Sequence, residues 1–525
     1  MIPNRTADRQ PRRMSPDWHA AVTPEALAIV MAHSGETVTY GQLDDRSRRF
    51  ATALRQQGLR AGDHVALLMG NERAFLEVAW AAQRAGLYYT AINSHLRSRE
   101  VQYVLDDCRA TALVCSADLA AVAAGLDVSR IPVRVSAGGH LRGFVHYDDV
   151  LASSPAGPVQ GEREGREMLY SSGTTGFPKG VRKPLPCNAF GDPSSVPAQI
   201  AAGMTDGSGA GSVYLCPAPL YHSAPLVGSM SWHRVGGTVV VMEKFDPREC
   251  LELIERYRIT DAQFVPTMFV RMLRLPDDVR AGYDVSTLRR VLHTGAPCSI
   301  AVKQQMLQWW GPIIDEYYSG TEDLGATYIS AQEWLRHPGS VGKPIEDCHV
   351  VGPDGQELEA REVGVVYFSG GRPFEYHNDN LRTRSVTNDK GWRTLGDMGF
   401  LDEEGYLYLT DRQAHMIISG GVNIYPQETE NLLLGHPAVV DVAVIGVPDE
   451  EMGEAVKAVV QLAEWAKPTV SLKSELIAFC RAELAAYKCP RTVDFVDALP
   501  RDPNGKLYKR LVRERYWADH ESRVN

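Results

Sequence analysis

Apolar and polar residues follow two different rhythms along the first 160 residues. Some stretches repeat apolar residues every three to four positions, which predicts amphipathic helices, and shorter apolar runs between them predict buried strands. The expected helices are TYGQLDDRSRRFATALRQQG (39–58) and RAFLEVAWAAQRAG (73–86), and the expected strands are HVALLMG (64–70) and ATALVCS (110–116). Because helices and strands take turns, this pattern predicts an α/β layered fold with a largely parallel sheet.

The same alternation returns between residues 212 and 320 and then changes character. Strands are expected in SVYLCPAP (212–219), TVVVM (238–242) and AQFVPTM (262–268), with a helix in PRECLELIERYRI (247–259). From 339 to 410, glycines, prolines and short alternating strands such as GVVYFSG (364–370) and GYLYLTD (405–411) predict a small β-rich unit.

A different module is expected near the C-terminus. A strand in EMGEAVKAVVQL (451–462) and a helix in SLKSELIAFCRAEL (471–484) indicate a compact α+β domain, with a linker near Asp411–His415. We therefore expect a large N-terminal α/β domain over 1–411 and a small C-terminal domain over 412–525.

Composition limits the class of protein. A chain of 525 residues is too long for one ordinary core, so at least two domains are expected. The hydrophobic content of 44% and charged content of 23% are typical of a soluble globular protein, and the net charge of −10 argues against a nucleic-acid binder. The sequence contains no 18-residue apolar run, so no membrane span is expected. No apolar segment follows the N-terminal arginines, so a secretory signal is not expected either.

The nine cysteines favour a reducing cytoplasm. Their number is odd, they are scattered, and no CxxC pair occurs among them. Neither an HExxH motif nor another tight His/Cys cluster indicates a structural metal.

The sharpest local signal is YSSGTTGFPKG at 170–180. Its glycines let the backbone approach an anion closely, its hydroxyls can donate to phosphate oxygens, and Lys179 adds a mobile positive charge. The candidate phosphate-binding residues are Ser171, Ser172, Gly173, Thr174, Thr175, Gly176 and Lys179. This is not a Walker A loop, because proline precedes the lysine and the following VRKPLP does not start a helix. GSGAGS (207–212) also fails the Rossmann pattern. A plain Ser/Thr/Gly surface turn is the alternative, which the full eleven residues disfavour.

With further motifs in a fixed order, the sequence resembles the adenylate-forming superfamily of acyl-CoA synthetases, luciferases and peptide-synthetase adenylation domains. The resemblance runs from about residue 20 to 515. The family's motifs match the loop 170–180, the acyl-pocket segment 219–223, the adenine turn Gly295, Ala296 and Pro297, the nucleotide motif Tyr318, Ser319, Gly320, Thr321 and Glu322, the ribose-binding Asp397, the hinge Asp411 and Arg412, the segment 419–423 with Gly420 and Gly421, and the catalytic Lys506.

The resemblance implies a role for each residue type. Lys506 would hold the substrate carboxylate and a phosphate oxygen together, and Thr321 would donate to the α-phosphate. Glu322 would ligate Mg²⁺, Asp397 would accept the ribose hydroxyls, and Tyr318 would offer a flat face to adenine. His222 either gates the acyl or thiol tunnel or packs in the pocket wall. Taken alone, an aspartate in LGD or a lysine in NGK is usually a solvated turn residue.

The resemblance also implies the reaction and its substrates. It predicts an enzyme that uses ATP and Mg²⁺ to activate a carboxylic acid as its acyl-adenylate and then passes the acyl group to coenzyme A. The C-terminal domain would take two orientations, one presenting Lys506 and the other Gly420 and Gly421. The family often forms homodimers, so a homodimer is open here. The alternatives are a stand-alone adenylation domain that loads a carrier protein, a less expected luciferase-type oxidative reaction, and a nucleotide-binding regulator without catalysis.

Two departures from the family's pattern stand out. After the phosphate loop the family often has Thr-His-x-Asn, where this chain has Arg182-Lys-Pro-Leu-Pro186, so a reshaped wall of the carboxylate pocket is expected. At the hinge the family commonly has Asp or Lys, where this chain has Ala414 followed by His415. The Arg-Lys-Pro run and the ending GKLYKR (505–510) resemble those of actinobacterial and bile-acid-type ligases, which implies a bulky polycyclic acid as substrate; fatty and aryl acids stay open.

Overall fold

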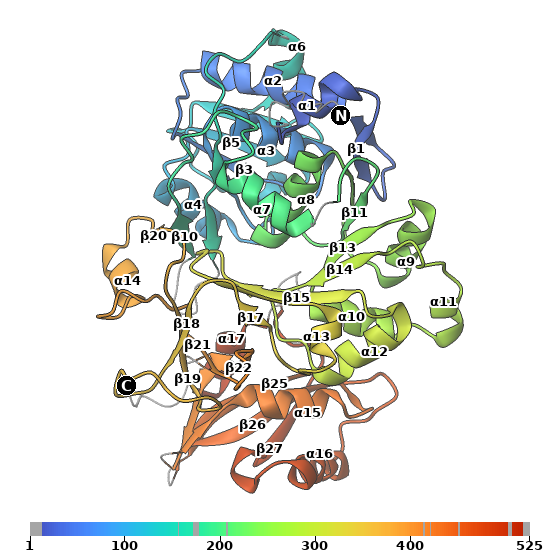
Figure 1. Ribbon diagram of the computed structural model, residues 1–525, viewed down its shortest axis with the longest axis vertical. Helices are drawn as coiled ribbons and strands as arrows, with labels where there is room; N and C mark the ends of the chain where they lie inside the picture. Colours follow the sequence, from blue (N-terminus) through green and yellow to red (C-terminus); the bar gives the residue numbers. More distant parts are fainter. Residues whose placement is uncertain are drawn as a thin grey trace, which may run out of the picture. The chain divides into compact units, whose positions relative to one another are not determined.

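The computed structural model describes residues 13–155, 157–171, 178–205, 208–412, 415–420, 422–449, 452–501 and 507–517. The chain divides into two compact units (Figure 1). The first unit comprises Met1–Phe264, Leu275–Val291 and Pro373–Asn380, and the second comprises Val265–Arg274, Leu292–Arg372 and Leu381–Asn525.

A parallel sheet with helical connections begins the first unit and confirms the alternation predicted from the sequence. Its strand order is β7-β6-β5-β3-β4-β8, and every pairing in it is parallel. The strands are β3 (His64–Leu68), β4 (Tyr88–Ala91), β5 (Ala112–Ser116), β6 (Val133–Ala137), β7 (Val145–His146) and β8 (Arg166–Glu167). The helices are α2 (Tyr40–Gln56), α3 (Arg73–Arg84), α4 (Ser98–Asp107), α5 (Ala120–Ala123) and α6 (Tyr147–Ser153). Helix α2 begins where predicted because Thr39 and Gln42 form a capping box.

A second sheet in this unit has the order β13-β11-β12-β1-β2, parallel except for the β1–β2 pair. Its strands are β1 (Leu27–Met31), β2 (Thr37–Thr39), β11 (Val213–Cys216), β12 (Thr238–Val241) and β13 (Asp261–Phe264), accompanied by α1 (Pro16–Val22), α7 (Val196–Thr205), α8 (Ser223–Val235), α9 (Pro247–Arg256) and α11 (Asp277–Ala281). The strand expected over 262–268 is wrong beyond Phe264. Helix α10 (Pro266–Leu273) starts there, because a proline is favourable in the first turn of a helix.

The second unit contains the β-rich region that the sequence predicts. Antiparallel strands β18 (Cys348–Val351), β19 (Gly364–Phe368), β21 (Asp397–Leu401) and β22 (Leu407–Arg412) form one sheet. Strands β15 (Ile314–Ser319), β16 (Ala326–Ile329) and β17 (Lys343–Pro344) pair antiparallel, with helices α12 (Ile300–Trp310) and α13 (Ala331–Trp334) nearby in sequence. Strand β14 (Arg290–His293) leads into α12, and the short helix α14 (Asn380–Ser385) precedes β21.

The C-terminal part of this unit is the expected α+β module. Its sheet contains β23 (Ile417–Ser419), β24 (Val422–Ile424), β25 (Val439–Asp449), β26 (Gly453–Leu462) and β27 (Thr492–Val496), with helices α15 (Pro426–Leu434), α16 (Val470–Glu483) and α17 (Lys509–Trp517). The linker expected at Asp411–His415 begins later than predicted, because Asp411 and Arg412 still belong to β22. Residues 413 and 414 lie outside the described part of the chain.

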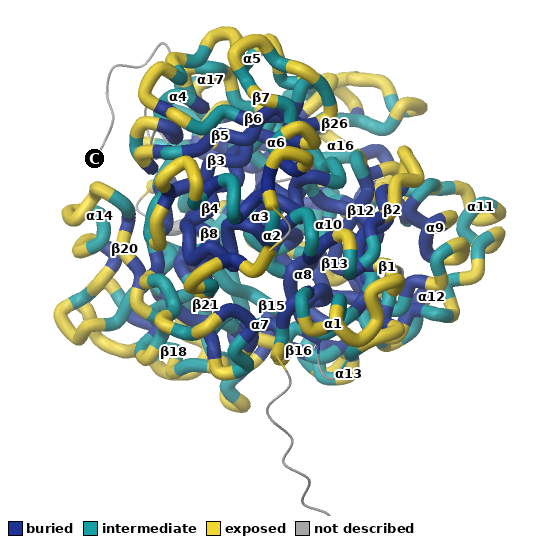
Figure 2. The backbone as a smooth tube through the Cα atoms, turned by 90° about the horizontal axis from the view of Figure 1, so that it is seen from above, coloured by how far each residue is buried: buried dark blue, intermediate teal, exposed yellow. Residues whose placement is uncertain are grey.

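Each unit has its own apolar interior. In the first unit, Trp80, Tyr214 and Trp232 are almost completely buried in a cluster that joins helices and both sheets. In the C-terminal module, Leu433, Val442 and other residues of β25, β26, α15 and α16 form a separate cluster. Figure 2 shows these buried segments in dark blue, with exposed segments on the outside. Burial of this apolar surface is the main force that stabilises the fold.

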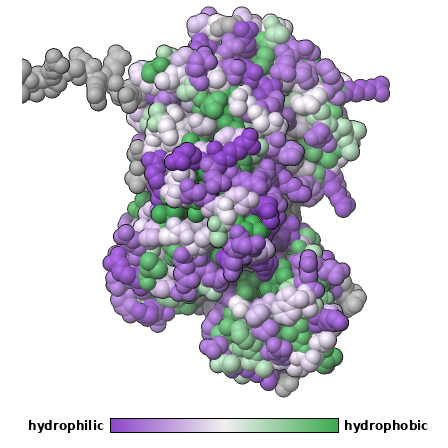
Figure 3. Space-filling view, turned by 90° about the vertical axis from the view of Figure 1, so that its right-hand side faces the viewer, coloured by the Kyte–Doolittle hydropathy of each residue, from purple (hydrophilic) through white to green (hydrophobic). Residues whose placement is uncertain are grey.

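The outer surface is mixed in polarity. Figure 3 shows hydrophilic residues over most of one face, with apolar residues in small separate groups between them. Among the described residues, no helix has both the length and the apolar character needed to cross a bilayer.

Candidate active site

The phosphate loop sits on an antiparallel hairpin. Strand β9 (Leu169–Ser171) pairs with β10 (Lys179–Arg182), and Ser171 lies opposite Lys179 in the register. The loop residues between them, Ser172, Gly173, Thr174, Thr175 and Gly176, fall outside the described residues. Strand β10 begins at Lys179, so no helix starts there, in agreement with the prediction that this is not a Walker A loop.

A hydrogen-bond network fastens the base of this hairpin. The Tyr170 hydroxyl donates to Oδ2 of Asp107, at the end of α4, over 2.6 Å. On the opposite strand, the carbonyl of Gly180 accepts a 2.8 Å hydrogen bond from the amide of His377. A methyl group at Gly180 would come within 3.0 Å of the Tyr170 ring, so a larger residue would fit there only if its neighbours moved. The hairpin is therefore held at Tyr170 and at Gly180, immediately below the loop.

The segment that departs from the family's pattern buries one of its two charges, that of Lys183, and leaves Arg182 partly exposed. Lys183 is only 6% exposed, and its Nζ lies 3.2 Å from Oε1 of the buried Glu167. Burial acts to raise the pKa of Glu167, but Lys183 and Arg166 outweigh it and lower that pKa to about 2. The guanidinium of Arg182 lies 5.4 Å from the centre of the Tyr88 ring. Lys183 is thus one partner of a buried ion pair.

Two nucleotide-motif residues meet across 79 positions of sequence. The Tyr318 hydroxyl, at the end of β15, donates to Oδ2 of Asp397, at the start of β21, over 2.5 Å. Asp397 is 6% exposed, and its strand register places it opposite Arg412 on β22. Gly295, in the predicted adenine turn with Ala296 and Pro297, has φ of +83°, a conformation that glycine adopts without strain.

Thr321 and Glu322 form the turn that follows β15 and Ser319. Glu322 is 8% exposed, and its Oε2 lies so near the backbone that a methyl group at Gly320 would approach it to 2.9 Å. Asp323 continues the turn with φ of +57° and pairs with Arg372 over 3.1 Å. This turn fixes a hard carboxylate oxygen directly after Thr321.

That carboxylate fits a magnesium ion carried by a nucleotide. Mg²⁺ usually keeps several waters and binds through one or two carboxylates together with substrate phosphates. The described residues contain no group of three or more His, Cys, Asp or Glu that could hold a metal by itself. One buried carboxylate beside the nucleotide motif agrees with the first kind of site and not with a closed protein cage.

His222 stands directly before helix α8, and Gly420 stands directly after strand β23. His222 is the N-cap of α8, and its ring centre lies 4.5 Å from that of Tyr221. Gly420 has φ of +57°, and its amide donates to the carbonyl of Met452 over 2.8 Å. A methyl group at Gly420 would approach Met452 Cε to 2.4 Å, so a larger residue would not fit without movement.

Lys506 and Gly421 lie outside the described residues, and the side chain of Arg412 is likewise not described. Helix α17 starts three residues after Lys506, and its first residue, Lys509, is buried. Lys509 Nζ lies 2.9 Å from Glu430 Oε1 and 3.9 Å from Asp411 Oδ2. The start of α17 is therefore anchored to α15 and to β22.

Sequence reasoning missed the charged residues that support these motifs. Asp107 holds the phosphate hairpin, and His293, Lys303 and Glu316 form a buried cluster next to the adenine turn. The available signal was a pair of charged residues among isoleucines and tyrosines, Asp315 and Glu316 in IIDEYY (313–318). Such residues are almost never buried unless they are paired.

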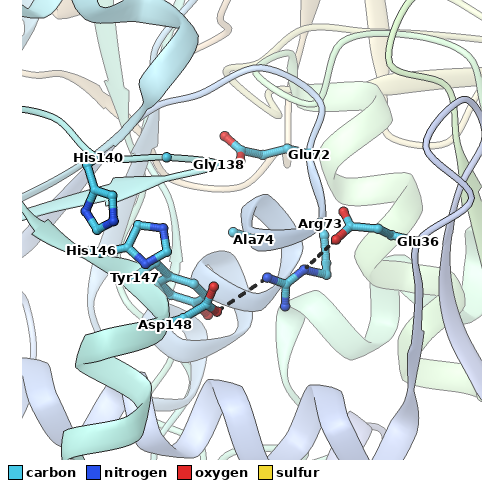
Figure 4. Close-up of a pocket in the computed structure, with 10 residues that line it drawn as sticks. Glu36, Glu72, Arg73, Ala74, Gly138, His140, His146, Tyr147 and Asp148 are labelled. Carbon is cyan, nitrogen blue, oxygen red and sulfur yellow. Dashed lines mark hydrogen bonds and ion pairs between the residues drawn. The ribbon is translucent and has the colours of Figure 1, made fainter.

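A cavity of about 360 Å³ lies in the first unit, and none of the described residues predicted for the site lines it. Figure 4 shows Arg73 between Glu36 and Asp148, and the rings of His140 and His146 near each other on the opposite wall. The guanidinium of Arg73 is 3.4 Å from Asp148 and 3.8 Å from Glu36. Arg73 is thus already paired within the cavity wall.

Comparison with known proteins adds a wider context. Residues 16–375 match the family model described as AMP-binding enzyme, and residues 428–506 match that of the AMP-binding enzyme C-terminal domain. A feruloyl-CoA synthase of an Amycolatopsis species is 34% identical over 505 residues, covering 95% of this chain and 98% of its own. ScoC of Streptomyces coeruleorubidus, a fatty acid–[acyl-carrier-protein] ligase, is 31% identical and covers 97% of both chains.

A solved structure resembles the whole fold. The o-succinylbenzoate CoA synthetase MenE from Bacillus subtilis, in complex with its acyl-adenylate intermediate, superposes with a TM-score of 0.78. The two sequences are 26% identical, and the match covers 97% of this chain and 98% of the other.

Proposed function

The chain belongs to the AMP-binding, adenylate-forming enzyme family, and on that premise we propose how its residues divide the work of an AMP-forming acid–CoA ligase. The enzyme activates a carboxylic acid with ATP and Mg²⁺ and transfers the acyl group to coenzyme A. The observation that carries our residue assignments is the 2.5 Å hydrogen bond from Tyr318 to Asp397, which joins two separate nucleotide motifs in one place.

In the first step, a carboxylate oxygen of the acid attacks the α-phosphorus of ATP. The bond from that phosphorus to the bridging oxygen breaks, pyrophosphate leaves, and an acyl-adenylate remains. We assign Asp397 to the ribose hydroxyls, with its orientation set by Tyr318, and residues 295–297 to adenine. Ser171, the loop 172–176 and Lys179 would cradle the outer phosphates, because hydroxyls, amides and an ammonium all favour anionic oxygens.

Charge repulsion is the main obstacle to this step, because an anionic acid must approach a polyanion. Lys506 would hold the carboxylate and a phosphate oxygen together, and Thr321 would donate to the α-phosphate. Glu322 would hold Mg²⁺, which neutralises phosphate charge when it is bound.

In the second step, the thiol of coenzyme A attacks the acyl carbon, the bond from that carbon to the adenylate oxygen breaks, and AMP leaves. We propose that the segment 412–525 moves as a unit between the two steps. Gly420 and Gly421 would then admit the thiol-bearing arm, which passes only where side chains are small. His222, at the N-cap of α8, would lie at the acyl or thiol tunnel.

For the acid, we propose a bulky ring-bearing carboxylate, with a fatty acid as the alternative. Relatives named for ferulate and o-succinylbenzoate support the first, and a relative named for fatty acids supports the second. The test is pyrophosphate release with a panel of phenylpropenoic, polycyclic and fatty acids at one concentration. A clear preference for ring-bearing acids is expected, and a preference for unbranched chains of ten or more carbons would overturn it.

For the acceptor, we propose free coenzyme A and not a carrier protein. The name of the feruloyl relative supports coenzyme A, and the name of ScoC supports a carrier. Acyl-CoA formation without any protein acceptor would establish the first.

We further propose that the protein is cytoplasmic and forms a homodimer. All nine cysteines are free, which supports a reducing compartment. Sedimentation would measure the oligomeric state.

The catalytic assignment of Lys506 has its own test. Lys506→Ala should abolish adenylate formation and largely spare thioester formation from supplied acyl-adenylate, because the second step uses the other orientation. Equal loss in both half-reactions of the folded variant would contradict the role.

A further inference from the structure

Three buried side chains of the second unit form one charged cluster. Lys303 of α12 places its Nζ 2.7 Å from Oε2 of Glu316, on β15. Nε2 of His293, the last residue of β14, lies 3.2 Å from the same oxygen. The side chains of Lys303 and His293 are fully buried, and that of Glu316 is 8% exposed. The Lys303 ammonium also lies 4.8 Å from the centre of the Trp334 ring.

The protonation states follow from burial. Desolvation lowers the pKa of His293, so its ring is neutral at pH 7. Desolvation acts to raise the pKa of Glu316, but the contacts with His293 and Lys303 outweigh it, so this carboxyl is ionised. The cluster is therefore one buried ion pair with a neutral imidazole against it.

The location of the cluster links it to the nucleotide. His293 stands two residues before Gly295, at the start of the adenine turn, and Lys303 lies in the helix that follows this turn. Glu316 stands two residues before Tyr318 on β15, and alternate residues of a strand lie on the same face. The cluster thus joins the three elements that flank the turn and Tyr318.

Stability alone is a poor reason for such a cluster. Replacing a buried ion pair by apolar residues of similar volume is often neutral or stabilising. Directional contacts between charged groups do, however, fix the relative positions of the elements that bear them, and binding sites need that support within a fraction of an ångström.

We propose that Lys303, Glu316 and His293 are positioning residues that hold the adenine turn 295–297 and Tyr318 at a fixed separation, so that adenine fits between them. This rests on the proposed assignment of these segments to adenine. It predicts that the cluster affects recognition of the base and leaves recognition of the phosphates and the acid unchanged.

The test is the double variant Lys303→Met/Glu316→Gln, which removes both charges without leaving one buried and unpaired. Adenosine carries the base without phosphates, and inorganic tripolyphosphate carries phosphates without the base. As competitive inhibitors against ATP, adenosine should bind about ten-fold more weakly to the variant, because sub-ångström misplacement is costly, and tripolyphosphate should bind as before. KM for the acid should stay within about two-fold.

Matched variants separate a local effect from a general one. Lys457→Met/Asp494→Asn removes an ion pair of 2.7 Å between β26 and β27 and should change neither inhibitor. Tyr318→Ala tests the adenine assignment itself. If Tyr318→Ala weakens adenosine and the cluster variant does not, the positioning role is wrong; if neither does, the adenine assignment is wrong.

If the double variant Lys303→Met/Glu316→Gln does not fold, a milder variant tests the same proposal. His293→Asn removes only the contact from β14 and keeps the Lys303–Glu316 pair. Adenosine binding should then weaken about three-fold with tripolyphosphate unchanged, since one of the two links remains. An unchanged adenosine constant in a folded variant, or a loss shared equally by adenosine and tripolyphosphate, would overturn the proposal.

Discussion

Single residues in this chain show how the same charged side chain can serve binding or packing. Lys179 and Lys183 are four residues apart, yet Lys179 opens β10 beside the phosphate loop and Lys183 is buried against Glu167. The sequence suggested that the Arg182–Pro186 departure reshapes the carboxylate pocket. The structure pairs the Lys183 ammonium with the carboxylate of Glu167, 3.2 Å away, and the expectation about the pocket stays a prediction.

Removal of Lys183 should therefore destabilise the protein. Lys183→Met leaves the buried Glu167 with only Arg166, 3.4 Å away, and the loss of the ammonium partner should cost about 3 kcal/mol, the low end for a broken buried pair. Because the folded pKa of Glu167 is depressed to about 2, the pair contributes its stability above the unfolded pKa of about 4.3, and this stability is lost as the pH falls toward 2. Urea unfolding at pH 7 and pH 3 measures both effects. An unchanged free energy of unfolding with an altered acid preference would place Lys183 at the acyl pocket instead.

Glu322 is the residue that tests the metal assignment. If it holds Mg²⁺, Glu322→Gln should slow adenylation by roughly two orders of magnitude and raise the Mg²⁺ concentration needed for half-maximal rate. A titration of pyrophosphate release against Mg²⁺ measures both quantities. The same half-maximal concentration in variant and wild type would remove Glu322 from the metal site.

At the scale of elements, the phosphate loop depends on the hairpin that carries it. The glycine-rich motif predicts the loop, but it does not predict the two strands, β9 and β10, that carry the loop. The anchors come from α4 and from the segment around His377, which lie 63 and 207 residues from Tyr170. Such distant partners cannot be read from local periodicity.

Loss of one anchor should loosen this hairpin. Tyr170→Phe removes the hydroxyl that Asp107 accepts and keeps the ring over Gly180. KM for ATP should rise about three- to ten-fold, because a charge-assisted hydrogen bond of this kind contributes about 1 kcal/mol or more. Steady-state kinetics with varied ATP is the measurement. Tyr516→Phe, which removes a similar 3.0 Å hydrogen bond to Asp494, is the control that should leave KM unchanged.

Much of the fold was predictable from periodicity, and the exceptions have physical causes. Helices α2 and α3 and strands β3 and β5 lie where the pattern placed them. The strand expected to reach residue 268 stops at Phe264, because Pro266 starts a helix. At the site, Tyr318 and Asp397 were identified as candidates through the resemblance to a family. Their meeting depends on tertiary packing, which no local pattern contains.

At the scale of the whole molecule, we propose that the segment after Arg412 changes orientation between the two steps. Asp411 is the residue before the last in β22. Its carboxylate accepts a 3.0 Å hydrogen bond from the amide of Gln427, at the start of α15, and lies 3.9 Å from Lys509 Nζ. These contacts tie the end of β22 to the module that carries Lys506. A turn near Ala414 would have to rearrange them between the two half-reactions.

A proline at the hinge should trap one orientation. Proline fixes φ near −65°, whereas alanine can reach several backbone conformations. Ala414→Pro should therefore block one half-reaction and spare the other, with ATP binding little changed. Separate assays of adenylate formation and of thioester formation from supplied adenylate decide it. Wild-type rates in both would place the pivot at another residue.

The central claim is that the acid attacks the α-phosphorus of ATP before the thiol attacks the acyl carbon. The most direct test uses the acid that the panel selects, labelled with ¹⁸O in its carboxyl group, with ATP, Mg²⁺ and coenzyme A. Mass spectrometry should find one ¹⁸O atom in AMP and none in pyrophosphate, because the attacking oxygen stays on the α-phosphorus when the thiol displaces it. Unlabelled AMP, or label in orthophosphate accompanied by ADP, would contradict the account.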